Sequence, residues 1–548
     1  MLLTAVKVKV AAMVAVAGLD TAEMPNASQA LISTLEKLAA DQKAASEQPG
    51  KGPDVNASFN AALAQVNELA KNGDKDAQYA LAHWGVLSNS NVNEIIDLYR
   101  KSAAQGQVLA KAELAQVLLQ AFPQDQERMA EAVKLIQEAE AANNKVARRL
   151  LANLHIAGLG GVEKSVDKAR ALLEKGSAEG DGEATLGLSQ LYAAGVPGLP
   201  KDEQKSLDYL IKASDQKNAV AMSTYAARLF NGDPAVEGSK ALVKKDPEKA
   251  IKMFEDAAAT GFAAANRLLG SIYESGASGK PRDLKKALEY FTKAANANDA
   301  QALFRLGNYF EAGLTDGEGD KAVVIVQQNA KSALDLYRLA AQNGQSEAFY
   351  NVGVYYETGT VVDKDVEKAF SFQLRAANAG LPQAQHRLAS YYQNGSGVAQ
   401  DLVAAIGWYQ RAAAAGFAPS QIALGQMYEM GAGGRPDPKA AAQEYTNAAQ
   451  QGAPLAMLRL ASLYERGLTS SKNEPELPRA LAYADLAVDA SNKDALAVKY
   501  RDELAAKMTA GQKDEAKKIY DSQKKAAAPA ATTEPAAAPT KPASTRKK

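Results

Sequence analysis

One pattern of small and large apolar positions recurs along most of the chain. A small residue stands four positions before a large apolar anchor, and a second small residue follows the anchor directly. Such spacings place all three side chains on one face of a helix, and the small ones allow another helix to approach closely. The pattern occurs eleven times, at the anchors Leu81, Leu114, Leu151, Leu188, Tyr225, Leu269, Leu306, Val352, Leu388, Leu424 and Leu460.

A second helix is predicted after each anchor helix. In nine units a glycine stands seven positions after the anchor, which suits the left-handed residue that ends a helix. The second helix carries a large residue three positions after its first alanine, as in Tyr290, Phe372 and Trp408. It is predicted to stop at a left-handed glycine or asparagine: Gly106, Asn143, Gly180, Asn218, Gly261, Asn298, Gly344, Gly380, Gly416, Gly452 and Asn492.

The anchors are usually 36 or 37 residues apart, so the units have a nearly constant length. Two intervals are longer, because extra residues stand around 233–247 and 315–331. Insertions in stacked repeats are expected in the loops between helices, and we predict loops at both places.

The repeated unit resembles the Sel1-like repeat, a relative of the tetratricopeptide repeat. The family pattern A-x3-LG-x2-Y-x2-G, then KA, then AA-x2-G, is almost complete in residues 381–452, which begin LPQAQHRLASYYQNG. The resemblance extends over about residues 74–492. It implies an all-α fold, a right-handed α-solenoid superhelix of about eleven helix-turn-helix repeats, that acts as a scaffold or adaptor. Bacterial members of the family are frequently exported.

The beginning of the chain has the features of an export signal. Lys7 and Lys9 precede a short apolar run, and Ala15-Val16-Ala17 forms a cleavage site. The alternative is a frayed first helix; either way the run is too short to cross a membrane. We predict a signal peptide at residues 1–17 and N-terminal helices with a degraded leading repeat at 18–73. Eleven repeats are predicted at 74–492, C-terminal capping helices at 493–525 and a disordered tail at 526–548.

Composition narrows the functional classes. The chain has no cysteine, which excludes disulfides, thiolate metal sites and a lipoprotein anchor. It also separates this chain from a cysteine-rich branch of the family to which β-lactam-related activity has been assigned. The 63 basic and 63 acidic residues cancel, so nucleic acid is not an expected partner. The tail carries a net charge of +3, and the body between the two ends is mildly acidic.

No catalytic, metal or cofactor site is predicted. The chain contains neither G-x-S-x-G nor H-E-x-x-H, and no phosphate-binding loop. Asp316, Glu318 and Asp320 alternate as in a calcium loop, but the required glycine and final glutamate are absent. The three histidines, His83, His155 and His386, are interpreted as structural.

A polar surface on the first helices is the remaining candidate site. Positions just before and two after the anchor lie off the core face, and they could form a concave groove that binds a partner. An acidic series, including Glu274, Glu357 and Glu429, stands five positions after the anchors. The alternative interpretation is that arginines of one repeat pair with glutamates of a neighbour. The candidate residues are Arg305, Asn308, Asn351, Arg387, Ser390, Gln426 and Arg459.

These features favour a noncatalytic, exported scaffold that binds a protein or cell-envelope partner, located in the periplasm or secreted. A carbohydrate-binding or peptidoglycan-binding accessory protein is the alternative. A cell-wall or β-lactam hydrolase is a weaker alternative, because no residue supports it.

Overall fold

The computed structural model describes most of the chain except its two ends and several short internal segments. The predicted signal peptide lies outside the described residues, and of the predicted tail only residues 526 and 527 lie inside, where they end the last helix. The described residues are 27–47, 53–87, 90–233, 242–277, 279–317, 322–470, 472 and 474–527.

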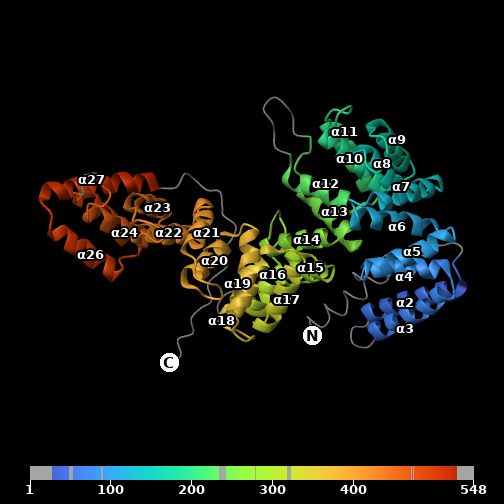
Figure 1. Ribbon diagram of the computed structural model, residues 1–548, viewed down its shortest axis with the longest axis horizontal. Coiled ribbons are helices and arrows are strands. Elements are labelled where there is room, and N and C mark those ends of the chain that lie inside the picture. The colour runs from blue at the N-terminus through green and yellow to red at the C-terminus, as the bar shows by residue number, and fades with distance from the viewer. Residues whose placement is uncertain are drawn as a thin grey trace. The chain divides into compact units, whose positions relative to one another are not determined.

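Helices make up most of the described chain, which confirms the all-α solenoid fold (Figure 1). The two helices α2 (Gln29–Glu47) and α3 (Val55–Lys71) come first. Eleven helical hairpins follow: α4 (Lys75–Leu87) with α5 (Val92–Ala104), α6 (Val108–Ala121) with α7 (Gln126–Ala141), α8 (Lys145–Ala157) with α9 (Val166–Ala178), α10 (Gly182–Ala194) with α11 (Glu203–Asp215), α12 (Ala219–Asn231) with α13 (Pro247–Ala259), α14 (Ala263–Ser275) with α15 (Leu284–Asn296), α16 (Ala300–Ala312) with α17 (Ala330–Gln342), α18 (Ser346–Thr358) with α19 (Val366–Asn378), α20 (Pro382–Asn394) with α21 (Leu402–Ala414), α22 (Ala418–Met430) with α23 (Pro438–Gln450), and α24 (Pro454–Glu465) with α25 (Leu477–Ala490).

The chain forms two compact units, residues 1–306 and 307–548. Within the two units, each helix packs against the next one along the chain from α2 to α15 and from α17 to α26, and α27 packs against α25. No helix in the described part of the chain is long and apolar enough to cross a membrane.

The small residues of the repeat lie where two helices touch. All eleven residues four positions before the anchors are completely buried, and eight of the anchors are buried as well. Directly after the anchor Leu424, a Cβ on Gly425 would lie only 2.5 Å from Cε1 of Tyr445 on the second helix. The small residue is therefore required by the ring that faces it, as the sequence pattern predicts.

The residue that fills each hairpin from the second helix stands one position after the large residue that the sequence pattern singles out. Phe291 and Tyr409, four positions after the first alanine, are the buried residues that fill the hairpins. Tyr290 and Trp408 are only half-buried, and Tyr290 stacks on Tyr273 with ring centroids 5.6 Å apart. The reason is the helical period, since the residue four positions on shares the face of the alanine better than the residue three positions on.

The predicted turn residues are correct with one exception. All nine glycines seven positions after the anchor have positive φ. Ten of the eleven predicted helix-ending residues do as well, but in the fourth hairpin Lys217 (φ 62°) replaces Asn218. Asn218 is instead the N-cap of α12, and its side chain accepts a hydrogen bond from the backbone of Ala221. An unbranched lysine thus occupies a backbone conformation that favours glycine.

The insertion predicted as a loop around residues 315–331 contains a small antiparallel hairpin. Strand β1 (Leu314–Asp316) pairs with β2 (Val323–Val326). The four-residue run VVIV has high β-propensity, which explains why a strand forms there. Val323 and Val324 are more than half exposed. Of the calcium-like motif, residues 318–321 lie outside the described residues.

Two further helices follow the last hairpin. Tyr500 on α26 (Ala495–Ala506) donates a hydrogen bond to Glu465 of α24 across 2.8 Å. Helix α27 (Ala510–Ala527) packs along α25, and Lys524 forms an ion pair of 2.7 Å with Asp489. These helices cover the last repeat, which is the role of a capping element in a solenoid.

Candidate partner-binding surface of the first helices

The seven candidate residues all lie on the first helices of their hairpins. Arg305 and Asn308 lie on α16, Asn351 on α18, Arg387 and Ser390 on α20, Gln426 on α22 and Arg459 on α24. First helices of successive hairpins also touch each other, as α4 touches α6 and α6 touches α8. This neighbourhood brings a side chain of one repeat within reach of the corresponding face of the next.

Two of the candidate arginines pair with glutamates of the preceding repeat. Nε and Nη2 of Arg305 lie 3.1 and 2.8 Å from Oε2 of Glu274. Nη1 of Arg387 lies 2.6 Å from Oε2 of Glu357, and its Nε donates to the hydroxyl of Tyr350 across 3.1 Å. Both pairs follow the alternative interpretation, in which the arginines join neighbouring repeats. A partly exposed pair of this kind contributes at most about 1 kcal/mol.

The acidic series accepts hydrogen bonds from buried tyrosines. The hydroxyl of Tyr337 lies 2.7 Å from Oε2 of Glu311 and 2.8 Å from Oδ1 of Asn308. Burial, reinforced by the Glu311 carboxylate, raises the pKa of Tyr337, whereas a hydrogen bond with Asn351 lowers it. The tyrosine therefore stays a neutral donor, and both candidate asparagines are hydrogen-bonded to it.

The same arrangement recurs in the next hairpins. Tyr409 donates to Gln393 across 2.8 Å, and its hydrogen bond with Ser390 holds its pKa down against the larger raising effect of burial. Tyr445 donates to Glu429 across 3.1 Å. Gln426 is half-buried. The polar residues on this surface thus support the tyrosines that fill the hairpins.

Arg459 is the exception among the candidates. It is exposed, and within the described residues it forms no ion pair. By analogy with Arg305 and Arg387, Arg459 would pair with the glutamate of the preceding repeat, which is Glu429. Glu429 instead binds Nη1 of Arg466 at 2.9 Å. Leu455, one turn earlier on the same face of α24, is 47% exposed. A guanidinium and a leucine side chain are therefore both available on this helix.

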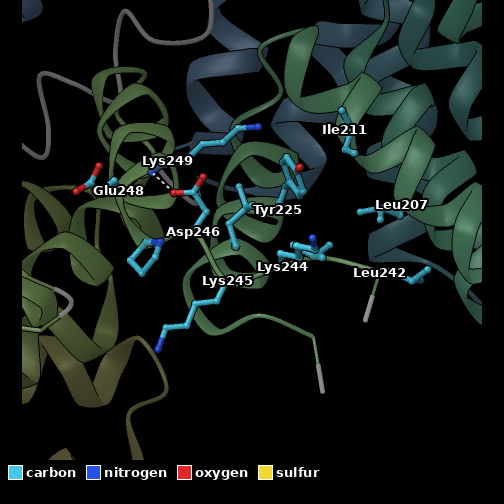
Figure 2. A pocket seen from close by; sticks show the side chains of 12 residues that line it. Leu207, Ile211, Tyr225, Leu242, Lys244, Lys245, Asp246, Glu248 and Lys249 are labelled. Carbon is cyan, nitrogen blue, oxygen red and sulfur yellow. Dashed lines mark hydrogen bonds between the residues drawn. The ribbon is translucent and has the colours of Figure 1, made fainter. Parts of the chain in front are cut away.

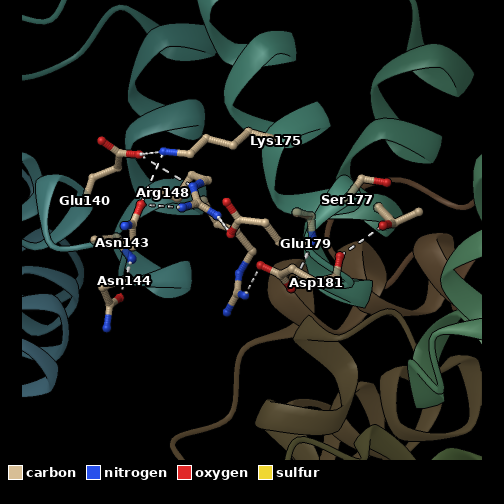
Figure 3. Close-up of polar contacts among 12 residues, drawn as sticks. Glu140, Asn143, Asn144, Arg148, Lys175, Ser177, Glu179 and Asp181 are labelled. Carbon is tan, nitrogen blue, oxygen red and sulfur yellow. Dashed lines mark hydrogen bonds and ion pairs between the residues drawn. The ribbon is translucent and has the colours of Figure 1, made fainter.

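A second polar feature, which the apolar pattern does not reveal, lies three positions before the anchors. Arg148 is completely buried there, and Nη1 bonds Oε2 of Glu179 at 2.5 Å (Figure 3). Its Nε lies 3.5 Å from Oε1 of Glu140, which Lys175 also approaches at 3.1 Å. The pairing offsets the large cost of burying a charge.

In other repeats a glutamine occupies the position of Arg148. Gln78, Gln385 and Gln421 each donate from Nε2 to the carbonyl eight residues earlier, at 3.1, 3.2 and 3.2 Å. Those carbonyls end the preceding second helix, where the last carbonyls have no partner within the helix. The sequence signal is a long polar side chain on an otherwise apolar face, repeated at a fixed offset.

His386 is surrounded by a serine and two aromatic rings. Nδ1 of His386 lies 2.9 Å from Oγ of Ser420, and its ring packs between Tyr409 and Phe417. Burial, with a smaller contribution from the Arg387 charge, lowers the pKa of His386 to about 4. Among the described residues no carboxylate is hydrogen-bonded to this ring, unlike in a catalytic triad. Among the described residues no group of three or more His, Asp or Glu side chains gathers that could hold a metal ion.

The family model described as "Sel1 repeat" matches nine segments that together cover more than half of the chain: 145–181, 182–218, 227–262, 263–299, 300–345, 346–381, 382–417, 418–452 and 454–492. The first two hairpins lie outside these matches. No curated protein matches.

The chain is similar to solved structures. A protective antigen from uropathogenic Escherichia coli, described as displaying an SLR fold, is 23% identical; the match covers 87% of this chain and 99% of the antigen, with a TM-score of 0.57. A Sel1 repeat protein from Oxalobacter formigenes is 28% identical over 48% of this chain and 96% of its own, with a TM-score of 0.40. The nine repeat matches and the eleven hairpins lead to one conclusion, that the chain belongs to the Sel1 repeat family.

Proposed function

We propose that the chain is a noncatalytic, exported scaffold that binds a protein or cell-envelope partner through its first helices. Sel1 repeat proteins generally mediate protein–protein interaction and are generally noncatalytic scaffolds. The observation that carries the proposal is the pair Leu455 and Arg459 on α24. Both are exposed, and Arg459 has no ion pair within the described chain.

This pair has the chemistry of an interface contact. Arginine is enriched in protein interfaces, and its five N–H groups suit a carboxylate on a partner. Leu496, at the corresponding place on α26, is 76% exposed and extends the apolar surface toward the end of the chain. Arg305, Asn308, Asn351, Arg387 and Ser390 already have partners within the chain, so we expect most of the binding energy near α24. Gln426 remains a candidate at its border.

Export is the second part of the proposal. It is supported by the basic start, the short apolar run and the Ala15-Val16-Ala17 cleavage site. The proposed location is the periplasm or the medium. N-terminal sequencing of the protein recovered from a periplasmic fraction should give Gly18 as the first residue. Recovery of the uncleaved chain from the cytoplasm would contradict export.

Affinity capture from an envelope extract tests the binding surface. The tagged chain should retain partners that the double variant Leu455→Ser with Arg459→Glu does not, while its thermal melt stays unchanged. Arg435→Glu is the matched control, because it reverses an exposed charge in a loop outside the first helices. Equal capture by all three proteins would count against α24 as the contact surface. Enrichment in a pellet with purified peptidoglycan would favour the polysaccharide-binding alternative instead.

A further inference from the structure

Two neighbouring loops in the first unit carry an unusual excess of positive charge. The eight residues around the N-cap of α13, 242–249, and those around the N-cap of α15, 279–286, contain seven basic and three acidic residues, a net charge of +4. The corresponding windows of any other consecutive pair of hairpins within residues 1–306 reach at most +1. The body of the chain is acidic, so this patch has the opposite sign to its surroundings.

Lysines in these two loops lack the ion pairs that lysines at the same position form in other hairpins. In α11 and α19 the lysine three residues after the N-cap forms an ion pair with the N-cap aspartate, at 3.6 Å for Lys205 and 2.8 Å for Lys368. Their counterparts Lys249 and Lys286 form none with any described residue, because Asp246 and Asp283 bond only their backbone N–H groups. Lys244, Lys245, Lys280 and Lys285 likewise have no ion pair within the described chain.

The unpaired ammonium groups are held in place by aromatic rings. Nζ of Lys249 lies 5.6 Å from the ring centroid of Tyr225, and Nζ of Lys286 lies 5.1 Å from that of Tyr273. Cation–π contacts of this kind restrain the long side chains and leave their charge uncompensated. The ammonium groups of Lys249 and Lys286 therefore lie along the edge where a loop connects the first helix of each hairpin to the second helix.

A hollow with an apolar floor lies inside this patch. It measures about 550 Å³, and Figure 2 shows the side chains around it. Leu207, Leu229 and Val243 are buried and line it together with Ile211, whereas Lys244, Lys245 and Lys249 stand at its border. A concave apolar site of this size accommodates a large side chain. A flat anionic bilayer surface could not fill it.

We infer that this patch binds an acidic, extended segment of a partner protein, with one large apolar side chain of that segment seated in the hollow. The lysines of both loops supply the electrostatic complement, and the hollow fixes the register of the segment. The site lies on the loop edge of the first unit, and it is distinct from the proposed surface on α24. It goes beyond the proposed function and does not depend on it.

A fluorescein-labelled twelve-residue peptide of aspartates and glutamates around one central leucine is the probe, with fluorescence anisotropy at low and moderate salt. We expect the full chain to bind it, and binding to weaken with salt because the border charges are exposed. The variant K244Q/K245Q/K249Q/K280Q/K285Q/K286Q should weaken binding by about tenfold or more. The matched control K164Q/K168Q/K201Q/K205Q changes the loops of α9 and α11, and it should bind as the unchanged chain does.

Three outcomes would overturn the inference. One is equal binding by the six-lysine variant, provided that circular dichroism shows both variants folded. Another is equal binding of a peptide in which glycine replaces the central leucine, because the hollow would then have no role. The third is binding to phosphatidylglycerol vesicles but not to the peptide, which would identify the patch as a membrane contact.

Discussion

Gln451 donates a hydrogen bond from Nε2 to Oε1 of Gln421 across 2.9 Å, and so joins the end of α23 to the start of α22. Gln421 in turn donates to the carbonyl of Ala413 at the end of α21. We call this series of two glutamine side chains and a helix-ending carbonyl the glutamine relay. Gln105 and Gln78 form the same relay in the first hairpin, with 2.9 Å between the two side chains. Three successive helices are thus connected by two amides, and the buried one (Gln421 or Gln78) uses both its donor and its acceptor.

One repeat lacks the last member of this relay, and restoring it should stabilise the fold. Oε1 of Gln385 is buried without a hydrogen-bond partner, because Ala415 stands where Gln451 stands in the next hairpin. The two backbones agree, with φ and ψ of −79° and 6° at Ala415 and −88° and 9° at Gln451. We expect Ala415→Gln to raise the free energy of unfolding by about 0.5–1.5 kcal/mol in urea denaturation.

The matched control for this change is Ala379→Gln. Ala379 ends α19 with a similar backbone, but Phe349 occupies the place of the acceptor glutamine. It should therefore gain nothing. Equal stabilisation by both substitutions would show that helix propensity, and not the hydrogen bond to Gln385, is responsible.

Lys217 offers a second stabilising change. A residue other than glycine costs about 1–2 kcal/mol in the left-handed conformation, and Lys217 has φ 62°. Lys217→Gly should raise the free energy of unfolding by about 1 kcal/mol, after the larger entropy of glycine in the unfolded chain is subtracted. The control Lys212→Gly lies inside α11, where glycine should destabilise by a similar amount. Chemical denaturation measures both.

The apolar pattern predicts the hairpins because it repeats in every unit, so eleven copies of each small residue and helix-ending residue can be compared within one chain. Polar contacts that form in only some repeats cannot be predicted by such a comparison. Arg305, Arg387 and Arg459 stand at the same distance from their anchors, yet only the first two pair with the preceding glutamate. Arg466 takes the glutamate that Arg459 would use, and this choice between two arginines depends on side-chain geometry. The spacing of residues alone does not contain that information.

His386 should make stability depend on pH in a definite direction. Its pKa falls from 6.5 in an unfolded chain to about 4 in the fold. The unfolded chain therefore binds more protons between these values, so the free energy of unfolding decreases as pH falls from about 6.5 to 4 and levels off above 6.5. The loss from this one group is at most about 3 kcal/mol. Denaturation of the unchanged chain and of His386→Gln at pH 7 and 4.5 measures the contribution of this histidine. The variant should lose less stability between the two pH values than the unchanged chain does. Equal losses would show that other groups cause the acid sensitivity.

Arg387 and Arg459 should differ in what their removal does to folding. Arg387 bonds Glu357 and Tyr350 and lies over the Tyr350 ring, 5.4 Å from its centroid. Its replacement by alanine leaves two polar groups without their donor, so Arg387→Ala should lower the free energy of unfolding by about 1–2 kcal/mol. Arg459→Ala removes an exposed side chain that has no ion pair in the described structure, and it should change stability by less than about 0.5 kcal/mol. Urea denaturation of the two variants compares them directly. A large loss for Arg459→Ala would mean that this residue supports the fold and is not reserved for a partner, which would remove the main support for a contact surface on α24.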